Sequence, residues 1–200
     1  WSSDVSLPIS VHADSGAIYR SFTFALMEID GGSVAEKVSQ IDPLSLNVFV
    51  RLQEGRQVQG VGSRVLDQEI RSRAVTENIR YVASAPRFRS RVDEMLRDFA
   101  RATNLVIDGR DIGTVVFPAT PYKFYLDASV EVRAARRLAE TREEATLEEL
   151  VDEVARRDQS DRERAVAPLQ QAADAIYIDT SSLDINAVVQ RILSHLQVQF

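Results

Sequence analysis

The stretch VIDGRDIGTVVFP, residues 106–118, runs from an apolar strand directly into a turn that carries two glycines and several charges. In an open α/β sheet, the carboxyl ends of the strands form the edge where ligands bind. Burying Asp108, Arg110 and Asp111 together would be costly unless they were paired or satisfied by a ligand. A structural Arg/Asp pair that closes a turn is the alternative, and this stretch alone leaves both interpretations open.

Other apolar runs extend this pattern along the chain. Residues 104–108, 122–127 and 175–179 are short runs of strand-forming side chains, each followed by Asp, Ser, Thr or Gly and then by a helical pattern. Residues 8–13 form a similar run before Asp14. Near-continuous apolar strands that alternate with helices predict an α/β fold, with a parallel sheet flanked by helices.

One segment departs from the strand–helix alternation. Between residues 45 and 61, apolar residues alternate on both sides of a turn at Glu54-Gly55, which predicts a β-hairpin. We expect a helical segment from about 64 to 82 to follow it, so that the two form a small inserted subdomain. The expected boundaries are 41–80 for the insert and 1–40 with 81–200 for the core.

Two predicted helices carry charges on their apolar side. In the helix that opens at Pro86, a stripe of Val92, Leu96 and Phe99 continues backward to Arg89. In a predicted helix from Thr146, residues three and four positions apart share one face that changes from apolar to charged along the helix. They are Leu147, Leu150, Val154, Arg157, Asp161 and Arg164. Because the charges continue a buried stripe, we expect a polar cleft there rather than a solvated ion-paired face.

The composition excludes several classes of function. A net charge of −6 argues against broad binding to nucleic acid or to an anionic membrane. Cysteine is absent and the two histidines, His12 and His195, lie far apart, so oxygen atoms would hold any metal. No apolar run approaches the roughly 20 residues that a membrane span needs, and Trp1-Ser2-Ser3-Asp4 has no signal-peptide pattern. We expect a soluble, cytoplasmic protein, and a monomer because no apolar surface stripe is left unexplained.

The basic residues are almost all arginine. Of 24 Lys and Arg residues, only Lys37 and Lys123 are lysine. The planar guanidinium of arginine suits bidentate binding of phosphate or carboxylate. A compositional bias explains the total count equally well, so only the positions of the arginines carry an argument.

Five segments together resemble the bacterial cytidylate kinases, which are nucleoside monophosphate kinases. They are DSGAIYR (14–20), APRFR (85–89), IDGRDIGTVVFP (107–118), VRAARR (132–137) and RDQSDRERAVAPL (157–169). Their order and spacing agree with that family from about residue 12 to the end of the chain. The resemblance implies a P-loop NTPase fold of the nucleoside monophosphate kinase type. It makes residues 41–80 the NMP-binding subdomain and places a short lid at about 138–158.

The same resemblance implies a reaction and its phosphate and ribose contacts. The reaction is transfer of the ATP γ-phosphate to CMP or dCMP with Mg²⁺, which requires mainly positioning and charge neutralisation. Arg20, Arg110 and Arg164 would hold the CMP phosphate, because a dianion needs several charge-assisted donors. Arg157 and Asp161 would contact the ribose. The expected catalytic residues are Arg110, Arg157 and Arg164.

Asp111 carries the expected choice of base. Cytosine presents an exocyclic N4 amino group to which a carboxylate can be the acceptor, whereas uracil presents an oxygen there. A buried carboxylate facing that oxygen would be left unsatisfied, which disfavours UMP by a few kcal/mol at most. Arg89 would donate to the acceptor edge of the base, and Ser15 would make a smaller contact at the same end.

The ATP side is expected to involve Asp108 and three arginines. Asp108 resembles the strand-end aspartate that reaches Mg²⁺ through water, and a turn-capping role is its equal alternative. Arg133, Arg136 and Arg137 resemble the start of the mobile lid over ATP. A solvent-exposed basic helix end is the alternative for these arginines.

Two features depart from the family pattern. The glycine-rich motif Gly-x-x-x-x-Gly-Lys-Ser/Thr, which cradles ATP phosphates, does not occur in these 200 residues. Either the sequence lacks its natural beginning, as its start at Trp1 favours, or the protein has lost the loop and only binds nucleotide. Arg80 stands where the family has a small hydroxyl residue near the base, and it would be repelled by Arg89 unless it points to solvent.

Three hypotheses follow. The first is a kinase for CMP or dCMP, which Asp111, Arg157 and Asp161 support. The second is a CMP-binding module without catalysis, which the missing loop supports. The third is a kinase for another monophosphate such as UMP or AMP, which Asp111 disfavours and Arg80 leaves open.

Overall fold

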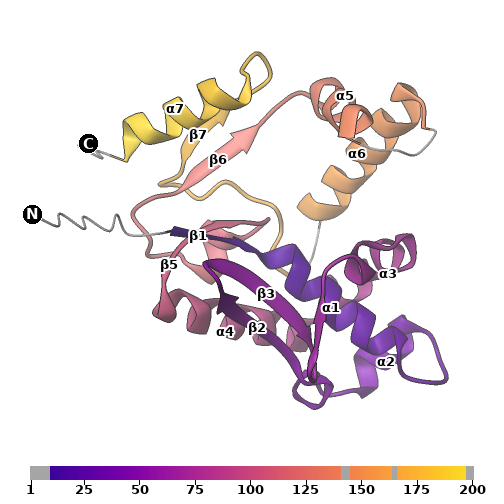
Figure 1. The fold of residues 1–200 in the computed structure, drawn as a ribbon. Coiled ribbons are helices and arrows are strands. Elements are labelled where there is room, and N and C mark those ends of the chain that lie inside the picture. Colours follow the sequence, from indigo (N-terminus) through magenta and orange to yellow (C-terminus); the bar gives the residue numbers. More distant parts are fainter. Residues whose placement is uncertain (1–9, 141–144, 164–165, 197–200) are drawn as a thin grey trace, which may run out of the picture. The chain divides into compact units, whose positions relative to one another are not determined.

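The fold divides into two compact units, Trp1–Ile112 and Gly113–Phe200. The computed structural model describes residues 10–140, 145–163 and 166–196 (Figure 1). Each unit contains a pair of parallel strands together with helices. The predicted alternation of parallel strands and helices is therefore confirmed. The expected division at residues 40 and 80 remains a prediction.

The first unit contains the parallel strands β1 (Ser10–Asp14) and β5 (Asn104–Asp108). Their register pairs Asp14 with Asp108, so both strands end at the same level with a carboxylate. Helix α1 (Ser15–Met27) begins directly after β1, because the Asp14 side chain accepts a hydrogen bond from the Ala17 amide at 3.0 Å. The polar ends of two neighbouring strands thus lie together at one sheet edge.

Helices of the first unit bury its apolar core. They are α2 (Val34–Gln40), η1 (Pro43–Leu46), η2 (Glu69–Arg71), α3 (Arg73–Ser84) and α4 (Pro86–Ala102). Helix α4 starts at Pro86, as predicted. Rings of Phe22 in α1 and Phe88 in α4 meet edge to face with centroids 5.5 Å apart, and both side chains are fully buried.

The predicted hairpin is confirmed, and a third strand that was not expected extends it to a three-stranded sheet. Strands β2 (Val48–Gln53) and β3 (Arg56–Val61) pair antiparallel across a turn whose residues Glu54 and Gly55 both have positive φ. A third strand, β4 (Arg64–Leu66), pairs with β3. In Figure 1 this sheet lies beside α1 and α4, with which β2 is in contact.

The expected helical segment from about 64 to 82 was therefore wrong in its first part. Residues 64–66 form β4, η2 follows, and regular helix begins only at Arg73. The reason lies in Gly60, since a Cβ there would sit 2.0 Å from the Arg64 carbonyl oxygen. A glycine in β3 lets the backbone of β4 approach and pair, which the local helical pattern did not reveal.

The second unit has its own parallel pair. Strands β6 (Phe124–Asp127) and β7 (Ile176–Asp179) run in register, with Asp127 opposite Asp179. The remaining elements are η3 (Ile112–Val116), a short π-helical segment at the junction, and helices α5 (Val130–Glu140), α6 (Leu147–Arg162) and α7 (Ile185–His195). Helix α6 begins with a capping box formed by Thr146 and Glu149.

Gln57 connects the hairpin sheet to the end of β1. Its side-chain oxygen accepts from the Asp14 amide at 2.9 Å, and its side-chain nitrogen donates to the Asp14 carbonyl at 3.1 Å. Gln59 continues the chain of hydrogen bonds, since it accepts from Gln57 at 3.2 Å and donates to the Leu66 carbonyl at 2.8 Å. One amide side chain thus replaces a backbone partner for the last residue of β1.

We expect Gln57→Ala to destabilise the protein. The substitution removes the partners of both backbone groups of Asp14, which should lower the free energy of unfolding by about 1–3 kcal/mol. Urea denaturation measures the change. Gln53→Ala is the matched control, because Gln53 is exposed in the same hairpin and makes only a 3.4 Å contact with Arg51. Equal losses from both variants would contradict a connecting role for Gln57.

Candidate nucleotide site

The loop after β5 approaches the start of α1 closely. The Ser15 hydroxyl donates to the Asp108 carbonyl at 2.9 Å, and Ser15 is buried. A Cβ on Gly109 would lie 2.9 Å from the Ser15 oxygen and 2.6 Å from the Ile112 side chain. Glycine is therefore required here for close approach of the two segments. The structure brings predicted site residue Ser15 together with the Asp108 backbone.

The three charges of this loop differ in their exposure. Asp111 is buried with 7 % of its surface exposed, whereas Asp108 and Arg110 are exposed. The loop therefore does not bury all three charges together. Only Asp111 needs the compensating partner that the sequence argument required.

Arg89 of α4 is that partner. The Arg89 guanidinium forms an ion pair with the Asp111 carboxylate, and their side chains are only 5 % and 9 % exposed. A second guanidinium nitrogen of Arg89 donates to the Ala83 carbonyl at 3.0 Å. The guanidinium also lies 5.7 Å from the centre of the Tyr19 ring. The prediction that Arg89 continues the apolar stripe of α4 is confirmed, because Val92, Leu96 and Phe99 are buried too.

Asp93 is a member of this buried group that the sequence analysis missed. It lies one helical turn after Arg89 in α4, and only 8 % of its surface is exposed. Burial raises the pKa of its carboxyl, and the negative charge of Asp111 raises it further, against the opposing effect of Arg89. Its position four residues after Arg89 in a buried stripe was the available signal.

Arg20 of α1 lies half-buried in the first unit. Its guanidinium donates to the Thr76 hydroxyl at 2.8 Å and to the Ile70 carbonyl at 3.3 Å. Burial lowers the pKa of Arg20, and the charge of Asp14 opposes this. Arg20 is thus oriented by α3 and η2 rather than by the other predicted phosphate ligands.

Asp108 and Arg80 are two further residues of this unit that the sequence analysis singled out. Asp108 accepts from the His12 ring at 2.6 Å, and both side chains are exposed. Within the described residues, no three His, Asp or Glu side chains are placed to hold a metal ion together. Arg80 is exposed and donates to the Tyr81 hydroxyl at 2.8 Å. Its side chain therefore points to solvent, the arrangement that avoids repulsion by Arg89.

In the second unit, α6 carries the predicted ribose residues. Asp161 is almost completely buried, with 2 % exposed, whereas Arg157 is exposed. The Asp161 carbonyl accepts from the Leu169 amide at 2.8 Å, which fixes the end of the helix. Leu150 and Val154 are buried as predicted, but Leu147 is 46 % exposed. Arg164, a predicted phosphate ligand, lies outside the described residues.

The three predicted lid arginines all have partners within the second unit. Arg133 forms a two-pronged ion pair with Asp158, with nitrogen–oxygen distances of 2.8 and 2.6 Å, and this hydrogen bonding raises the pKa of Arg133. Arg136 donates to the Thr180 carbonyl at 2.6 Å, and Arg137 pairs with Glu153 at 2.9 Å. They are therefore not simply solvated ends of a basic helix.

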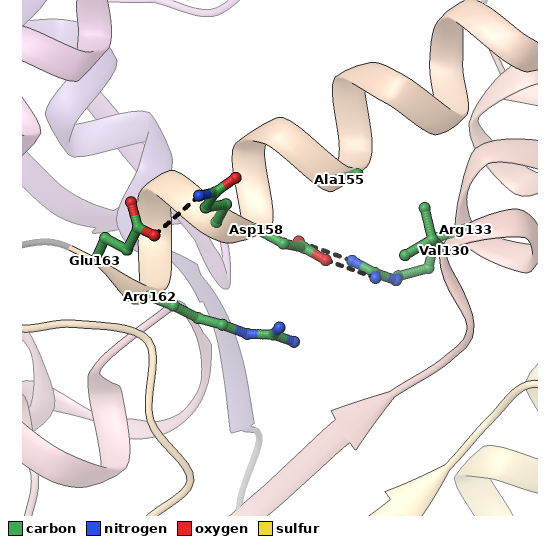
Figure 2. Close-up of a pocket in the computed structure, with 7 residues that line it drawn as sticks. Val130, Arg133, Ala155, Asp158, Arg162 and Glu163 are labelled. Carbon is green, nitrogen blue, oxygen red and sulfur yellow. Dashed lines mark hydrogen bonds and ion pairs between the residues drawn. The ribbon is translucent and has the colours of Figure 1, made fainter.

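A cavity of about 360 Å³ lies next to the Arg133–Asp158 pair. Figure 2 shows the two side chains facing each other and Arg162 extending into the space beside them. Val130 and Glu163 also line the cavity. Two guanidinium groups and two carboxylates thus surround one open space between α5 and α6.

The comparisons with known proteins agree on one family. A family model described as cytidylate kinase matches residues 7–198. The chain belongs to the cytidylate kinase family. The cytidylate kinase of Exiguobacterium sibiricum is 42 % identical to the chain over 187 residues, and that of Methylococcus capsulatus is 42 % identical over 195 residues. These alignments cover 91 % and 92 % of the chain, and 83 % and 84 % of the relatives.

Membership of the cytidylate kinase family confirms the predicted resemblance and the P-loop type of α/β fold. The described part of the chain contains no helix long and apolar enough to cross a membrane. The roles of individual residues are not tested by family membership, and they stay predictions.

The buried ion pair gives a testable prediction for this family member. Asp111→Ala leaves the Arg89 guanidinium buried without its carboxylate and should lower the free energy of unfolding by about 3–5 kcal/mol. The double variant Arg89→Met with Asp111→Leu should lose less than Asp111→Ala alone, because neither residue then leaves a charge uncompensated. Urea denaturation of Arg89→Met, Asp111→Leu and the variant that combines them measures the coupling. Additive losses would show that the two side chains do not stabilise each other.

Proposed function

We propose that the protein transfers the γ-phosphate of ATP to CMP or dCMP in the presence of Mg²⁺. The observation that carries the proposal is the buried Asp111 carboxylate, oriented by Arg89 at the carboxyl end of a parallel strand. Such a carboxylate accepts a hydrogen bond from the N4 amino group of cytosine and repels the oxygen of uracil. Relatives that carry the same family pattern are named cytidylate kinases.

The base end of the acceptor nucleotide would be held by residues of the first unit. Arg89 supplies donors for the ring nitrogen and carbonyl of the base, while its ion pair fixes the orientation of Asp111. Ser15 is restrained by its hydrogen bond to the Asp108 carbonyl and offers its oxygen as an acceptor nearby. Because these groups are buried or restrained before the base arrives, little ordering accompanies binding.

The phosphate end requires cations. Arg20 and Arg110 of the first unit would neutralise the CMP phosphate and the charge that develops during transfer. Arg110 is exposed at the loop after β5, where it can reach a nucleotide phosphate without first losing a buried position. In the second unit, Arg157 and Arg164 would supply further positive charge, and the Asp161 carboxylate would accept from ribose hydroxyls.

Mg²⁺ would enter with ATP, and the donor set suits it. Asp108 is an exposed, hard carboxylate, and Mg²⁺ prefers to keep several waters while phosphates supply other ligands. Bound Mg²⁺ would neutralise phosphate charge. Arg133, Arg136 and Arg137 would belong to the lid over ATP, with the two-pronged contact to Asp158 fixing the orientation of Arg133. Since the glycine-rich phosphate motif does not occur in residues 1–200, the sequence assigns no residue to the ATP phosphate cradle.

The first test concerns the site for the nucleotide that accepts the phosphate. Calorimetric titration should give a lower Kd for CMP and dCMP than for UMP, by about 10- to 100-fold. The native protein with MgATP should form CDP and dCDP ahead of UDP and ADP. CMP binding without diphosphate formation would replace the kinase by a CMP-binding module, and equal use of UMP would contradict the base assignment.

Asp111→Asn isolates the contribution of the carboxylate to base choice. The amide of asparagine can turn either its oxygen toward cytosine or its nitrogen toward uracil, so the preference for CMP over UMP should fall at least about tenfold. Competition between the two nucleotides measures the ratio. Asp98→Asn is the matched control, because Asp98 is an exposed residue of α4 that pairs with Arg101. An unchanged ratio in Asp111→Asn would exclude Asp111 from base selection.

Asp161→Asn separates the ribose from the base. Removal of one acceptor charge should weaken CMP and UMP binding by the same factor, about 10-fold, and leave their ratio unchanged. Asp152→Asn, an exposed change on the same helix, should alter neither affinity. A change in the CMP to UMP ratio would place Asp161 at the base instead of the sugar.

A further inference from the structure

The buried group around Asp111 contains one more carboxyl than the ion pair requires. Arg89 and Asp93 lie one turn apart on α4, and Asp111 reaches the same group from the loop after β5. All three residues are less than 9 % exposed. With both carboxyls ionised, the group would contain two negative charges and one positive charge in a region largely withdrawn from water.

The Asp93 carboxyl differs from that of Asp111 in its contacts. Oxygen Oδ1 of Asp93 is buried and accepts no hydrogen bond from any described residue. When the carboxyl is ionised, a buried oxygen without a donor loses its hydration without replacement, whereas a neutral carboxyl loses much less. The unpartnered oxygen therefore favours the neutral form of Asp93 beside the ion pair of Arg89 and Asp111.

The charges that act on Asp93 come from two elements. On α4 itself, Arg89 and Arg97 favour its ionised form, and Glu94 opposes it; Asp111, in the loop after β5, also opposes it. Burial is the largest effect, and together with Asp111 it raises the pKa of Asp93. The positive charge of Arg89 attracts both carboxyl groups. Ionisation of Asp93 therefore competes with the ion pair between Arg89 and Asp111.

We propose that Asp93 is a positioning residue for base recognition: as a neutral acid it leaves Arg89 paired with Asp111, and as a carboxylate it draws Arg89 away. The proposal rests on the proposed function, since Asp111 and Arg89 are the base contacts assigned there. Asp93 itself need not touch the nucleotide. Ionisation of Asp93 then weakens CMP binding, and CMP binding in turn favours the protonated form of Asp93.

The binding experiment compares wild type with Asp93→Asn, which keeps the shape and stays neutral at every pH. The Kd for CMP is measured by calorimetry from about pH 4, near the ordinary aspartate pKa, to about pH 8.5. Because the nucleotide titrates identically in both titrations, the ratio of the two Kd values at each pH reports the protein alone. We expect the Kd of wild type divided by the Kd of Asp93→Asn to rise at least about threefold with pH, because wild type loses affinity and Asp93→Asn does not.

Asp98→Asn is the matched control, since Asp98 is an exposed residue of α4 that pairs with Arg101 and does not contribute to the raised pKa of Asp93. Its Kd should follow wild type at every pH. A constant ratio between wild type and Asp93→Asn would overturn the proposal, because a merely structural role lowers affinity without a pH dependence.

A second measurement does not need nucleotide. A carboxyl whose pKa is raised by folding binds more protons in the folded state, so wild type should lose stability as pH rises from the ordinary aspartate value to the raised one. Asp93→Asn lacks this loss, and urea denaturation across the same pH range compares the two. A stability difference that does not change with pH would overturn the neutral state of Asp93. Failure of wild type to bind CMP at any pH would instead overturn the proposed function and the base-recognition role that rests on it.

Discussion

The buried ion pair between Arg89 and Asp111 is the constraint on which the first unit's site depends. Strand β5 separates helix α4 from the loop that follows it, and the helix and the loop each place a charged group where water is largely excluded. Neither group is tolerable there without the other. The pair therefore fixes the position of the loop relative to the helix, and the exposed Arg110 beside it is presented at a defined place.

Backbone approach adds a second constraint around that pair. Gly109 allows the loop to lie against Ser15, and the Gln57 amide satisfies both backbone groups of Asp14 from the hairpin sheet. These contacts use groups that carry no charge, so they hold the loop and the first turn of α1 without adding to the electrostatic cost of the site. The hairpin sheet thus takes part in shaping the sheet edge through the Gln57 side chain.

The sequence contained enough to predict the strands, the hairpin turn, the buried Arg89 and the family. These depend on local apolar patterns and on short motifs, which act over a few residues. Strand β4 was missed because its pairing depends on the missing side chain of Gly60 in the neighbouring strand, which no helical periodicity expresses. The partners of Arg133 and Arg136 were also beyond the sequence, because Asp158 and Thr180 become neighbours only after folding.

Asp93 shows most clearly why burial decides what a charged residue does. In the sequence it is one of three acidic residues on a polar helix, and its spacing from Arg89 would suit an ordinary ion pair on a helix surface. In the structure Arg89 is already paired with Asp111, so a second carboxylate nearby finds its natural partner occupied. The cost of charging it where water is largely excluded, together with the charge of Asp111, raises the pKa of its carboxyl. A single guanidinium shared by two carboxyls thus turns a structural ion pair into an arrangement that depends on protonation.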